Sequence, residues 1–234
     1  MKIKHLQLIE GAKQAEGLTV IIDVFRAFSL ECYLYDMGVK EIRPIGSIED
    51  AFALSEKIPN SILVGERKGK KCEGFDYGNS PSAVDREHVA DKTVIHTTSA
   101  GTQGIVNAQN AEEIITGSLV NAKAIVSYIK SKNPETVSIV SMGTRGIRTN
   151  PEDELCAEYL ISLLEDREMP DIEERIASLR TNGGEHFFDP DNQEVFPEAD
   201  YWMCIKHDQF PFVIRVEKDE LGFVGRKYGR GVLQ

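Results

Sequence analysis

Acidic, basic, hydroxyl-bearing and glycine residues recur directly after the short apolar runs of this sequence. Asp23 and Arg26 follow the first run, Glu66 and Arg67 a later one, and a Thr-Thr-Ser-Ala-Gly-Thr segment at 97–102 another. Carboxylates bind Mg²⁺ through hard oxygen ligands, and arginines pair with phosphate oxygens bidentately. Glycine turns at helix N-termini offer N–H groups to anions. This combination indicates a site for an anion, such as a phosphate group, together with Mg²⁺.

Further polar side chains stand at equivalent places along the chain. Asp76, Asn79 and Ser80 share one glycine-bounded segment, and Arg145 lies in a Gly-Thr-Arg-Gly turn. Asp153 lies in the first turn of an expected helix. Because ligands of open α/β sheets bind outside the carboxyl ends of the strands, we expect these side chains to meet there.

Each segment also has a purely structural explanation. Asp23 can cap the helix that follows it, and residues 97–102 can form an ordinary Ser/Thr/Gly turn. Glu66 and Arg67 can form a surface ion pair, and acids at 152–153 suit the first turn of a helix. His96, inside an apolar run, is expected to be a hydrogen-bonded core residue.

Alternating strands and helices must position these residues. Apolar runs predict strands, and helical periods with capping residues, such as Asn150 followed by Pro151, predict helices. The expected strands are residues 18–22, 41–45, 61–64, 93–96, 113–116 and 137–140, and the expected helices 27–37, 48–57, 101–108, 121–130 and 151–166. The alternation predicts a three-layer α/β/α sandwich with a mainly parallel sheet.

The C-terminal third is expected to be less regular. Residues 189–208 are rich in proline, acids and aromatics, which predicts a long loop. Two strands at 212–216 and 221–224 follow, and their antiparallel pairing makes the sheet mixed. We expect a single domain over residues 1–234; the alternative is two closely packed α/β halves without a clear boundary.

Composition excludes several classes of protein. The chain has 234 residues and a net charge of −11, which argues against non-specific nucleic-acid binding. No apolar run approaches the ~20 residues of a membrane span, and the N-terminus lacks a signal-peptide pattern, so a cytoplasmic location is expected. The four cysteines form no Cys-x-x-Cys pair and are expected to be buried thiols. A homodimer is typical of soluble enzymes of this size.

Common phosphate-binding motifs are absent. The sequence contains no Gly-x4-Gly-Lys-Ser/Thr loop, and no Gly-x-Gly-x-x-Gly follows the first strand. Val24 and Phe25 follow Asp23, so the Asp-x-Asp of haloacid-dehalogenase phosphatases is missing. The residues alone therefore indicate an α/β protein with an anion and Mg²⁺ site.

The order and spacing of the polar segments, from about residue 19 to residue 159, resemble the 2-phosphosulfolactate phosphatase family, the ComB-like proteins. The most specific segments are Asp-Val-Phe-Arg-Ala at 23–27 and Gly-Phe-Asp-Tyr-Gly-Asn-Ser-Pro at 74–81. The family often has threonine in place of Phe28, and Thr-Asn-Gly-Thr in place of residues 99–102. The other matching segments are 65–67, 97–102, 117–121 and 152–157.

The resemblance implies a Mg²⁺-dependent phosphatase that hydrolyses 2-phospho-3-sulfolactate to 3-sulfolactate and inorganic phosphate. In methanogens this step belongs to coenzyme M biosynthesis. The alternatives are a phosphatase for another small phosphorylated carboxylic acid and a non-catalytic sensor of anionic metabolites. The substrate in each case is a small anion.

The strand-end pattern and the resemblance together suggest a role for each candidate residue. Asp23, Arg26 and Arg67 are the expected catalytic residues, and the two arginines would neutralise charge on the phosphoryl group. The nucleophile is either a water activated by the metal or Asp23 itself. The expected metal ligands are Asp23, Glu66, Asp76 and Asp153, and the expected substrate-binding residues are Ser29, Asn79, Ser80, Thr98, Ser99, Gly101, Thr102 and Arg145.

Overall fold

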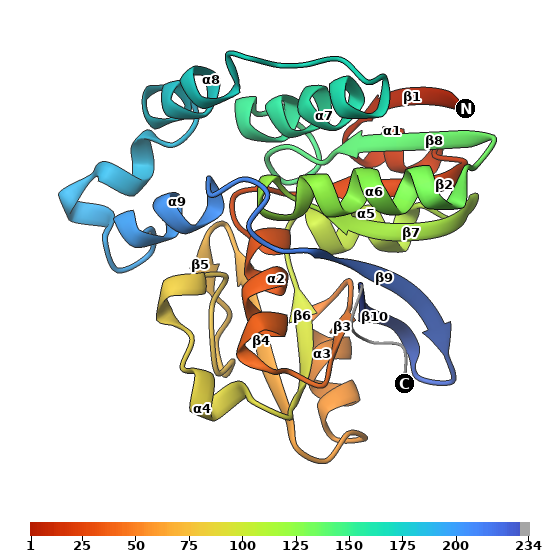
Figure 1. Ribbon diagram of the computed structural model, residues 1–234. Coiled ribbons are helices and arrows are strands. Elements are labelled where there is room, and N and C mark those ends of the chain that lie inside the picture. The colour runs from red at the N-terminus through yellow and green to blue at the C-terminus, as the bar shows by residue number, and fades with distance from the viewer. Residues whose placement is uncertain (230–234) are drawn as a thin grey trace.

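The computed structural model describes residues 1–229, and ten strands there form one sheet. In chain order they are β1 (Lys2–Gln7), β2 (Gly17–Ile22), β3 (Glu41–Pro44), β4 (Ser61–Arg67), β5 (Lys70–Lys71), β6 (Thr93–Thr97), β7 (Ala111–Gly117), β8 (Thr136–Ser141), β9 (Phe212–Asp219) and β10 (Gly222–Gly229). Their order across the sheet is β1-β8-β2-β7-β9-β10-β3-β6-β4-β5 (Figure 1).

The sheet consists of two parallel blocks joined by an antiparallel hairpin. Strands β1, β8, β2 and β7 are parallel to one another, as are β3, β6 and β4. The hairpin of β9 and β10 lies between the blocks and pairs antiparallel with β7 on one side and β3 on the other. The sheet is therefore mixed and mostly parallel, as the sequence predicts.

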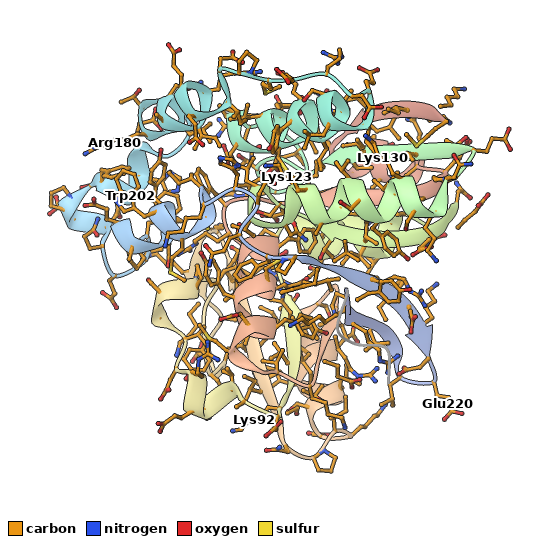
Figure 2. The ribbon with its side chains drawn as sticks, viewed as in Figure 1. Lys92, Lys123, Lys130, Arg180, Trp202 and Glu220 are labelled. Carbon is orange, nitrogen blue, oxygen red and sulfur yellow. The ribbon has the colours of Figure 1, made fainter. Side chains whose placement is uncertain are left out.

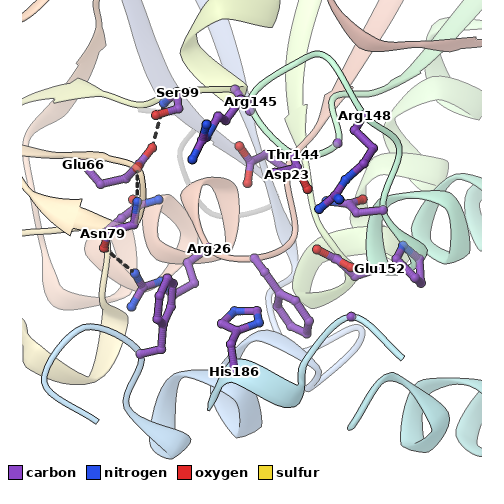
Figure 3. Close-up of a pocket in the computed structure, with 18 of the residues that line it drawn as sticks. Asp23, Arg26, Glu66, Asn79, Ser99, Thr144, Arg145, Arg148, Glu152 and His186 are labelled. Atoms are coloured by element: carbon purple, nitrogen blue, oxygen red, sulfur yellow. Dashed lines mark hydrogen bonds between the residues drawn. The ribbon is translucent and has the colours of Figure 1, made fainter. Parts of the chain in front are cut away.

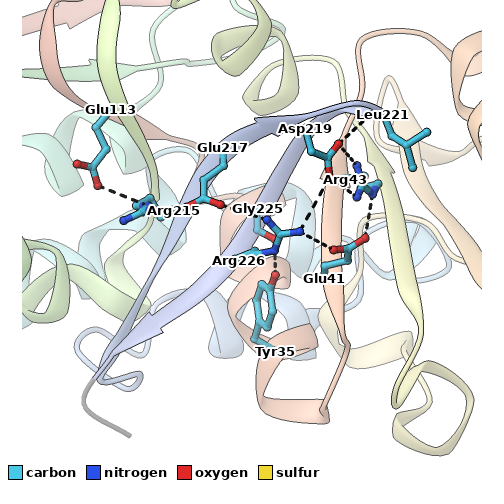
Figure 4. A network of polar contacts seen from close by, with 10 residues as sticks. All are labelled: Tyr35, Glu41, Arg43, Glu113, Arg215, Glu217, Asp219, Leu221, Gly225 and Arg226. Atoms are coloured by element: carbon cyan, nitrogen blue, oxygen red, sulfur yellow. Dashed lines mark hydrogen bonds and ion pairs between the residues drawn. The ribbon is translucent and has the colours of Figure 1, made fainter. Parts of the chain in front are cut away.

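Ion pairs reinforce both seams of this hairpin (Figure 4). Arg43 on β3 pairs with Asp219 on β9 at 2.7 Å, and Arg226 on β10 pairs with Glu41 on β3 at 3.2 Å. On the other side, Arg215 lies 4.0 Å from Glu113 of β7. The hairpin is thus attached to each block by charge as well as by backbone hydrogen bonds.

Helices cover both faces of the sheet. Helices α3 (Ile48–Ser55), α6 (Ala122–Lys132) and α7 (Pro151–Leu164) pack on one face, and α1 (Leu8–Lys13), α2 (Ala27–Met37) and α5 (Gly101–Asn107) on the other. The predicted three-layer sandwich is confirmed. The remaining helices are α4 (Arg86–Val89), α8 (Ile172–Ser178) and α9 (Glu198–Cys204).

Strand β2 shows why its continuous apolar run predicts burial on both faces. Val20 and Ile22 pack with the side chains of α6 and α7, whereas Ile21 between them packs with α1 and α5. Side chains fill the space between the layers throughout (Figure 2), while charged residues such as Lys130 and Glu220 extend from the surface. The strand ends are therefore packed between helices on both faces.

Capping residues explain several helix boundaries. The Asn150 side chain accepts a hydrogen bond from Asp153 N and begins α7 at Pro151, and the Ser47 side chain accepts one from Asp50 N and begins α3. Gly38 ends α2 with a left-handed φ of 95°. The start of α7 at Asn150 and Pro151 is the one that the sequence predicts, and it is confirmed.

Two segments differ from expectation. Strand β1 was not predicted, because its partly exposed residues lack the buried apolar run of the other strands. The predicted loop over residues 189–208 is wrong in part, because it contains helix α9. Pro197 directly precedes this helix and acids occupy its first turn, so residues typical of a loop here begin a helix instead.

Residues 1–229 bear on the predictions about membrane spans and about the cysteines. None of the helices found there is both long and apolar enough to cross a lipid bilayer. All four cysteines are buried and unpaired with one another, as predicted.

Candidate active site

A pocket of about 560 Å³ opens at the carboxyl edge of the sheet (Figure 3). Asp23 and Gly143 line it from the ends of β2 and β8 in one parallel block, and Glu66 and Ser99 from β4 and the end of β6 in the other. The opposite wall comes from residues 182–196, between α8 and α9. The pocket thus lies where both blocks of the sheet end.

Asp23 lies at the junction of two helix N-termini. Its carboxylate accepts hydrogen bonds from Gly101 N at 2.8 Å and from Ala27 N at 3.3 Å. Burial raises the pKa of Asp23 to about 6, and the nearby charge of Glu66 adds to the effect. A Cβ on Gly101 would lie 2.9 Å from Asp23 Oδ2, so this close approach requires glycine. Asp23 therefore lines the pocket. It also makes the helix-capping contact that is its purely structural explanation.

Glu152, at the start of α7, is the second carboxylate of the pocket wall. Its Oε2 atom is buried and has no hydrogen-bond partner among residues 1–229. Burial, followed by the charge of Asp23, raises the pKa of Glu152 to about 8. Gly183, with a φ of 110°, covers this oxygen so closely that a Cβ there would lie 2.8 Å away. An unpaired buried carboxylate oxygen beside a second acid favours a cation as the absent partner.

Asp153 and Glu66 each connect two backbone segments. The oxygens of Asp153 accept from Val24 N and Gly143 N, both at 2.8 Å, and the side chain does not line the pocket. Burial and the neighbouring charge of Asp23 raise the pKa of Asp153 well above its usual range. Glu66 does line the pocket, and its oxygens accept from Ser99 N and Gly69 N at 2.7 Å (Figure 3). Both carboxylates fix the loops that shape the pocket.

Arg26 lines the pocket, and a buried ion pair with Asp200 holds its guanidinium in place. The sequence does not predict this ion pair. Arg26 Nη1 donates to Asp200 Oδ2 at 2.6 Å and to Val195 O at 2.9 Å. Its Nη2 donates to Gly69 O at 3.3 Å, and its guanidinium lies 4.9 Å from the centre of the Phe196 ring. A guanidinium has more N–H groups than these contacts use.

Three further cations surround the pocket mouth: Lys68, Arg145 and Arg148. All three are exposed, and none forms an ion pair within the described part of the chain. His186 lies on the wall formed by residues 182–196, where burial and the charge of Arg26 lower its pKa. Figure 3 shows Arg145 directed into the same space as Asp23. This side of the pocket is positive and open to an anion.

Of the predicted site residues, Asp23, Arg26, Glu66, Asn79, Ser99 and Arg145 line the pocket. Arg67 does not: its guanidinium donates to Thr97 Oγ1 at 2.9 Å and to Gly46 O at 3.3 Å, away from the pocket. Asp76 is exposed, and its Oδ2 accepts from Leu63 N at 2.8 Å near the start of β4. The structure therefore separates Arg67 and Asp76 from the predicted group.

Apart from Ser99, the predicted hydroxyl ligands hold loops instead of lining the pocket. Ser29 Oγ donates to Val24 O at 2.8 Å, and Ser80 Oγ donates to Asp200 Oδ1 at 2.9 Å. Thr98 and Thr102 exchange hydrogen bonds with each other, and Gly101 contributes its N–H to Asp23. These residues shape the site from behind.

Several lining residues were not assigned from the sequence. Arg148 lies on the loop after β8, and Glu152 lies in the first turn of α7. In the sequence, the arginine resembles a surface charge and the acid resembles an ordinary first-turn residue. His186 and Phe196 come from the segment after α7, which carries no strand-end signal. The unassigned lining residues with polar side chains are Lys68, Thr144, Arg148, Thr149, Asn150, Glu152, Asn182 and His186.

The residues present fit a hydrated Mg²⁺ better than a closed metal cage. Within residues 1–229, no three or more His, Cys, Asp or Glu side chains are grouped to enclose a metal. Mg²⁺ instead keeps several waters and is bound by one or two carboxylates plus substrate phosphate oxygens. Asp23 and Glu152 face the same pocket, and the charge of Asp23 adds to the raised pKa of Glu152, so this pair satisfies that requirement.

The raised pKa of Glu152 predicts a measurable effect on stability. A carboxyl whose folded pKa exceeds its unfolded value binds more protons when folded, so it destabilises the fold as pH rises through about 4 to 8. We expect Glu152→Gln to melt at a higher temperature than the parent chain at pH 8.5 without metal, with the difference shrinking toward pH 5. Thermal unfolding measured by circular dichroism checks this, and a pH-independent difference would contradict it.

Comparisons with known proteins identify the family of the chain. A family model described as 2-phosphosulpholactate phosphatase matches residues 4–219. A probable 2-phosphosulfolactate phosphatase of Bacillus subtilis is 31% identical over 205 residues, covering 86% of this chain and 88% of that protein. One from Caldicellulosiruptor saccharolyticus is 33% identical over 221 residues, covering 87% and 90%. By this match over nearly the whole chain and these identities, the chain belongs to the 2-phosphosulfolactate phosphatase family, whose members are hydrolases of phosphoric monoesters.

Proposed function

We propose that the chain is a Mg²⁺-dependent phosphatase that hydrolyses 2-phospho-3-sulfolactate to 3-sulfolactate and inorganic phosphate. The observation that carries this proposal is the division of the pocket. Two buried carboxylates with raised pKa values lie on one side, and cations without ion-pair partners among residues 1–229 lie at the mouth. The family membership supports the same reaction class.

The acidic side would hold the cation. Asp23 and Glu152 would bind Mg²⁺ directly or through water, and the unpaired Oε2 of Glu152 would gain a partner. Mg²⁺ bound there would neutralise charge on the phosphoryl group and lower the pKa of a coordinated water. Glu66 and Asp153 would act indirectly, since each holds backbone segments of the pocket in place.

The positive side would hold the substrate anion. Arg145 and Arg148 can pair bidentately with phosphate, carboxylate or sulfonate oxygens, and Lys68 adds a third charge. A substrate with one transferred and two retained anionic groups matches this number of unpaired cations better than a simple phosphate ester does. Asp23 is poised between the two sides, near helix N-termini that favour negative charge.

A panel of phosphorylated carboxylic acids tests the proposal. We expect phosphate release from 2-phosphosulfolactate with Mg²⁺, loss of that release with EDTA, and recovery when Mg²⁺ is restored. The matched control is phospholactate, which lacks the sulfonate; its kcat/KM is expected to be lower by about tenfold to a hundredfold, the value of one charge-assisted contact.

Two other outcomes would identify the alternatives. Equal turnover of several esters would retain the phosphatase and replace its substrate with a broader class of phosphorylated acids. Anion binding by calorimetry, unchanged by EDTA and without any phosphate release, would instead identify a sensor. Metal-independent turnover would contradict the role proposed for Asp23 and Glu152.

A further inference from the structure

A buried chain of three polar side chains runs from the core to the pocket wall. Glu31 on α2 and His96 on β6 are about as buried as any residue of the protein, with exposures of 1% and 0%. His96 Nδ1 lies 2.9 Å from Glu31 Oε1, and His96 Nε2 lies 3.0 Å from Asn79 Oδ1. Asn79 in turn lines the pocket. The core histidine expected from the sequence therefore contacts a pocket residue.

The chemistry of the partners determines where the hydrogens lie. Oδ1 of Asn79 accepts hydrogen bonds but cannot donate, so His96 Nε2 must carry a hydrogen to bond with it. Glu31 Oε1 lies at the other ring nitrogen, 2.9 Å from Nδ1, and no other acidic group is within ion-pair distance of the ring among residues 1–229. The ring is therefore held between Glu31 and Asn79, with Nε2 directed at the amide oxygen.

This arrangement fixes the orientation of the Asn79 amide. With Oδ1 held by His96, the NH₂ group remains, and it has no hydrogen-bond partner among residues 1–229. Figure 3 shows Asn79 at the pocket wall beside Glu66. The opposite orientation would turn the carbonyl oxygen toward the pocket, where it would repel an anion.

We propose that Glu31 and His96 are positioning residues that hold the Asn79 NH₂ toward the pocket as a donor to an oxygen of the anionic substrate. This inference rests on the proposed function and deepens it, because it names two buried residues behind the pocket wall that make the site selective for anions. His96 touches no substrate and acts only through Asn79.

Two matched substitutions separate positioning from mere structure. The amide of His96→Gln can reach the position of Nε2 and donate to Asn79, whereas that of His96→Asn reaches only the position of Nδ1 and retains only Glu31. We expect His96→Asn to raise KM by about tenfold to a hundredfold with little change in kcat, and His96→Gln to stay within about threefold of the parent. Melting temperatures verify that both variants fold.

Equal KM values in the two variants would overturn the proposal. A third variant, Asn79→Asp, keeps the acceptor for His96 but replaces the donor with a negative oxygen, so its KM is expected to rise at least as far as that of His96→Asn. An unchanged KM in Asn79→Asp would also overturn the proposal.

Nuclear magnetic resonance tests the arrangement independently of turnover. In the full chain labelled with ¹⁵N-histidine, we expect Nε2 of His96 to carry a hydrogen, with the signal assigned by its loss in His96→Gln. An unprotonated Nε2 would overturn the inference. If no ester is hydrolysed, the proposed function fails, but the spectrum and the affinity of each variant for inorganic phosphate still decide the role of His96.

Discussion

Replacing Asp23 with Asn is expected to lower kcat/KM by about a thousandfold or more while leaving the melting temperature unchanged or higher. The activity falls because the substitution removes the charge shared by the proposed metal site and the phosphoryl group. Stability does not fall, because burial raises the pKa of Asp23 to about 6, which means that ionising this group at neutral pH costs folding free energy. The neutral amide avoids that cost and can still accept from Gly101 N.

A second carboxylate provides the control. Asp76 was predicted from the sequence to belong to the same metal site, yet it is exposed and outside the pocket, where it accepts from Leu63 N. We expect Asp76→Asn to retain activity within about twofold, since exposed substitutions away from such features have small effects. Steady-state phosphate release and thermal unfolding of both variants check the pair. Comparable losses in the two variants would mean that the pocket is not the site of the chemistry.

Replacing Arg26 with Leu is expected to destabilise the fold by about 3–5 kcal/mol, because it leaves Asp200 buried without its counter-charge. The effect also spreads through the site. Asp200 accepts from the Ser80 and Ser82 hydroxyls and from Ser82 N, so loss of its partner disturbs the turn next to Asn79. We therefore expect lower activity together with the lower stability.

Urea unfolding of a double-mutant cycle measures the pair. The double variant Arg26→Leu with Asp200→Asn is expected to be more stable than Arg26→Leu alone, since it removes the unpaired charge. The ion pair between Arg86 and Asp36 is the control, because both side chains are more than half exposed and Arg86→Leu should cost less than about 1 kcal/mol. Equal losses for Arg26→Leu and Arg86→Leu would contradict this account.

The sequence could predict the sheet and its faces because the strands carry continuous apolar runs. Val20, Ile21 and Ile22 are buried whichever face they point to, so the strand is recognisable without knowing its neighbours. The position of the hairpin between the two blocks could not be predicted in the same way. That arrangement depends on which strand edges β9 and β10 pair with, and the apolar periodicity of a sequence carries no information about strand order.

The site was predictable only in part, for reasons that particular residues illustrate. Glu66 and Arg67 are adjacent and both polar, so nothing in their order tells which one faces the pocket; alternation along β4 selects Glu66. Asp200 lies far along the chain from Arg26, in a segment whose composition resembles a loop. Glu152 resembled a first-turn acid because it is one, and only burial beside Asp23 gives it a second role.

The central hairpin also has a consequence for how the chain is made. Of the strands described, β9 and β10 leave the ribosome last, yet both blocks of the sheet pair with them. Until they emerge, the edges of β7 and β3 that they will cover are unpaired, and such edges are templates for aggregation. The sheet can therefore close only after β10 has emerged, and a nascent chain stalled before Phe212 would depend on chaperones in a way that a chain containing the hairpin does not.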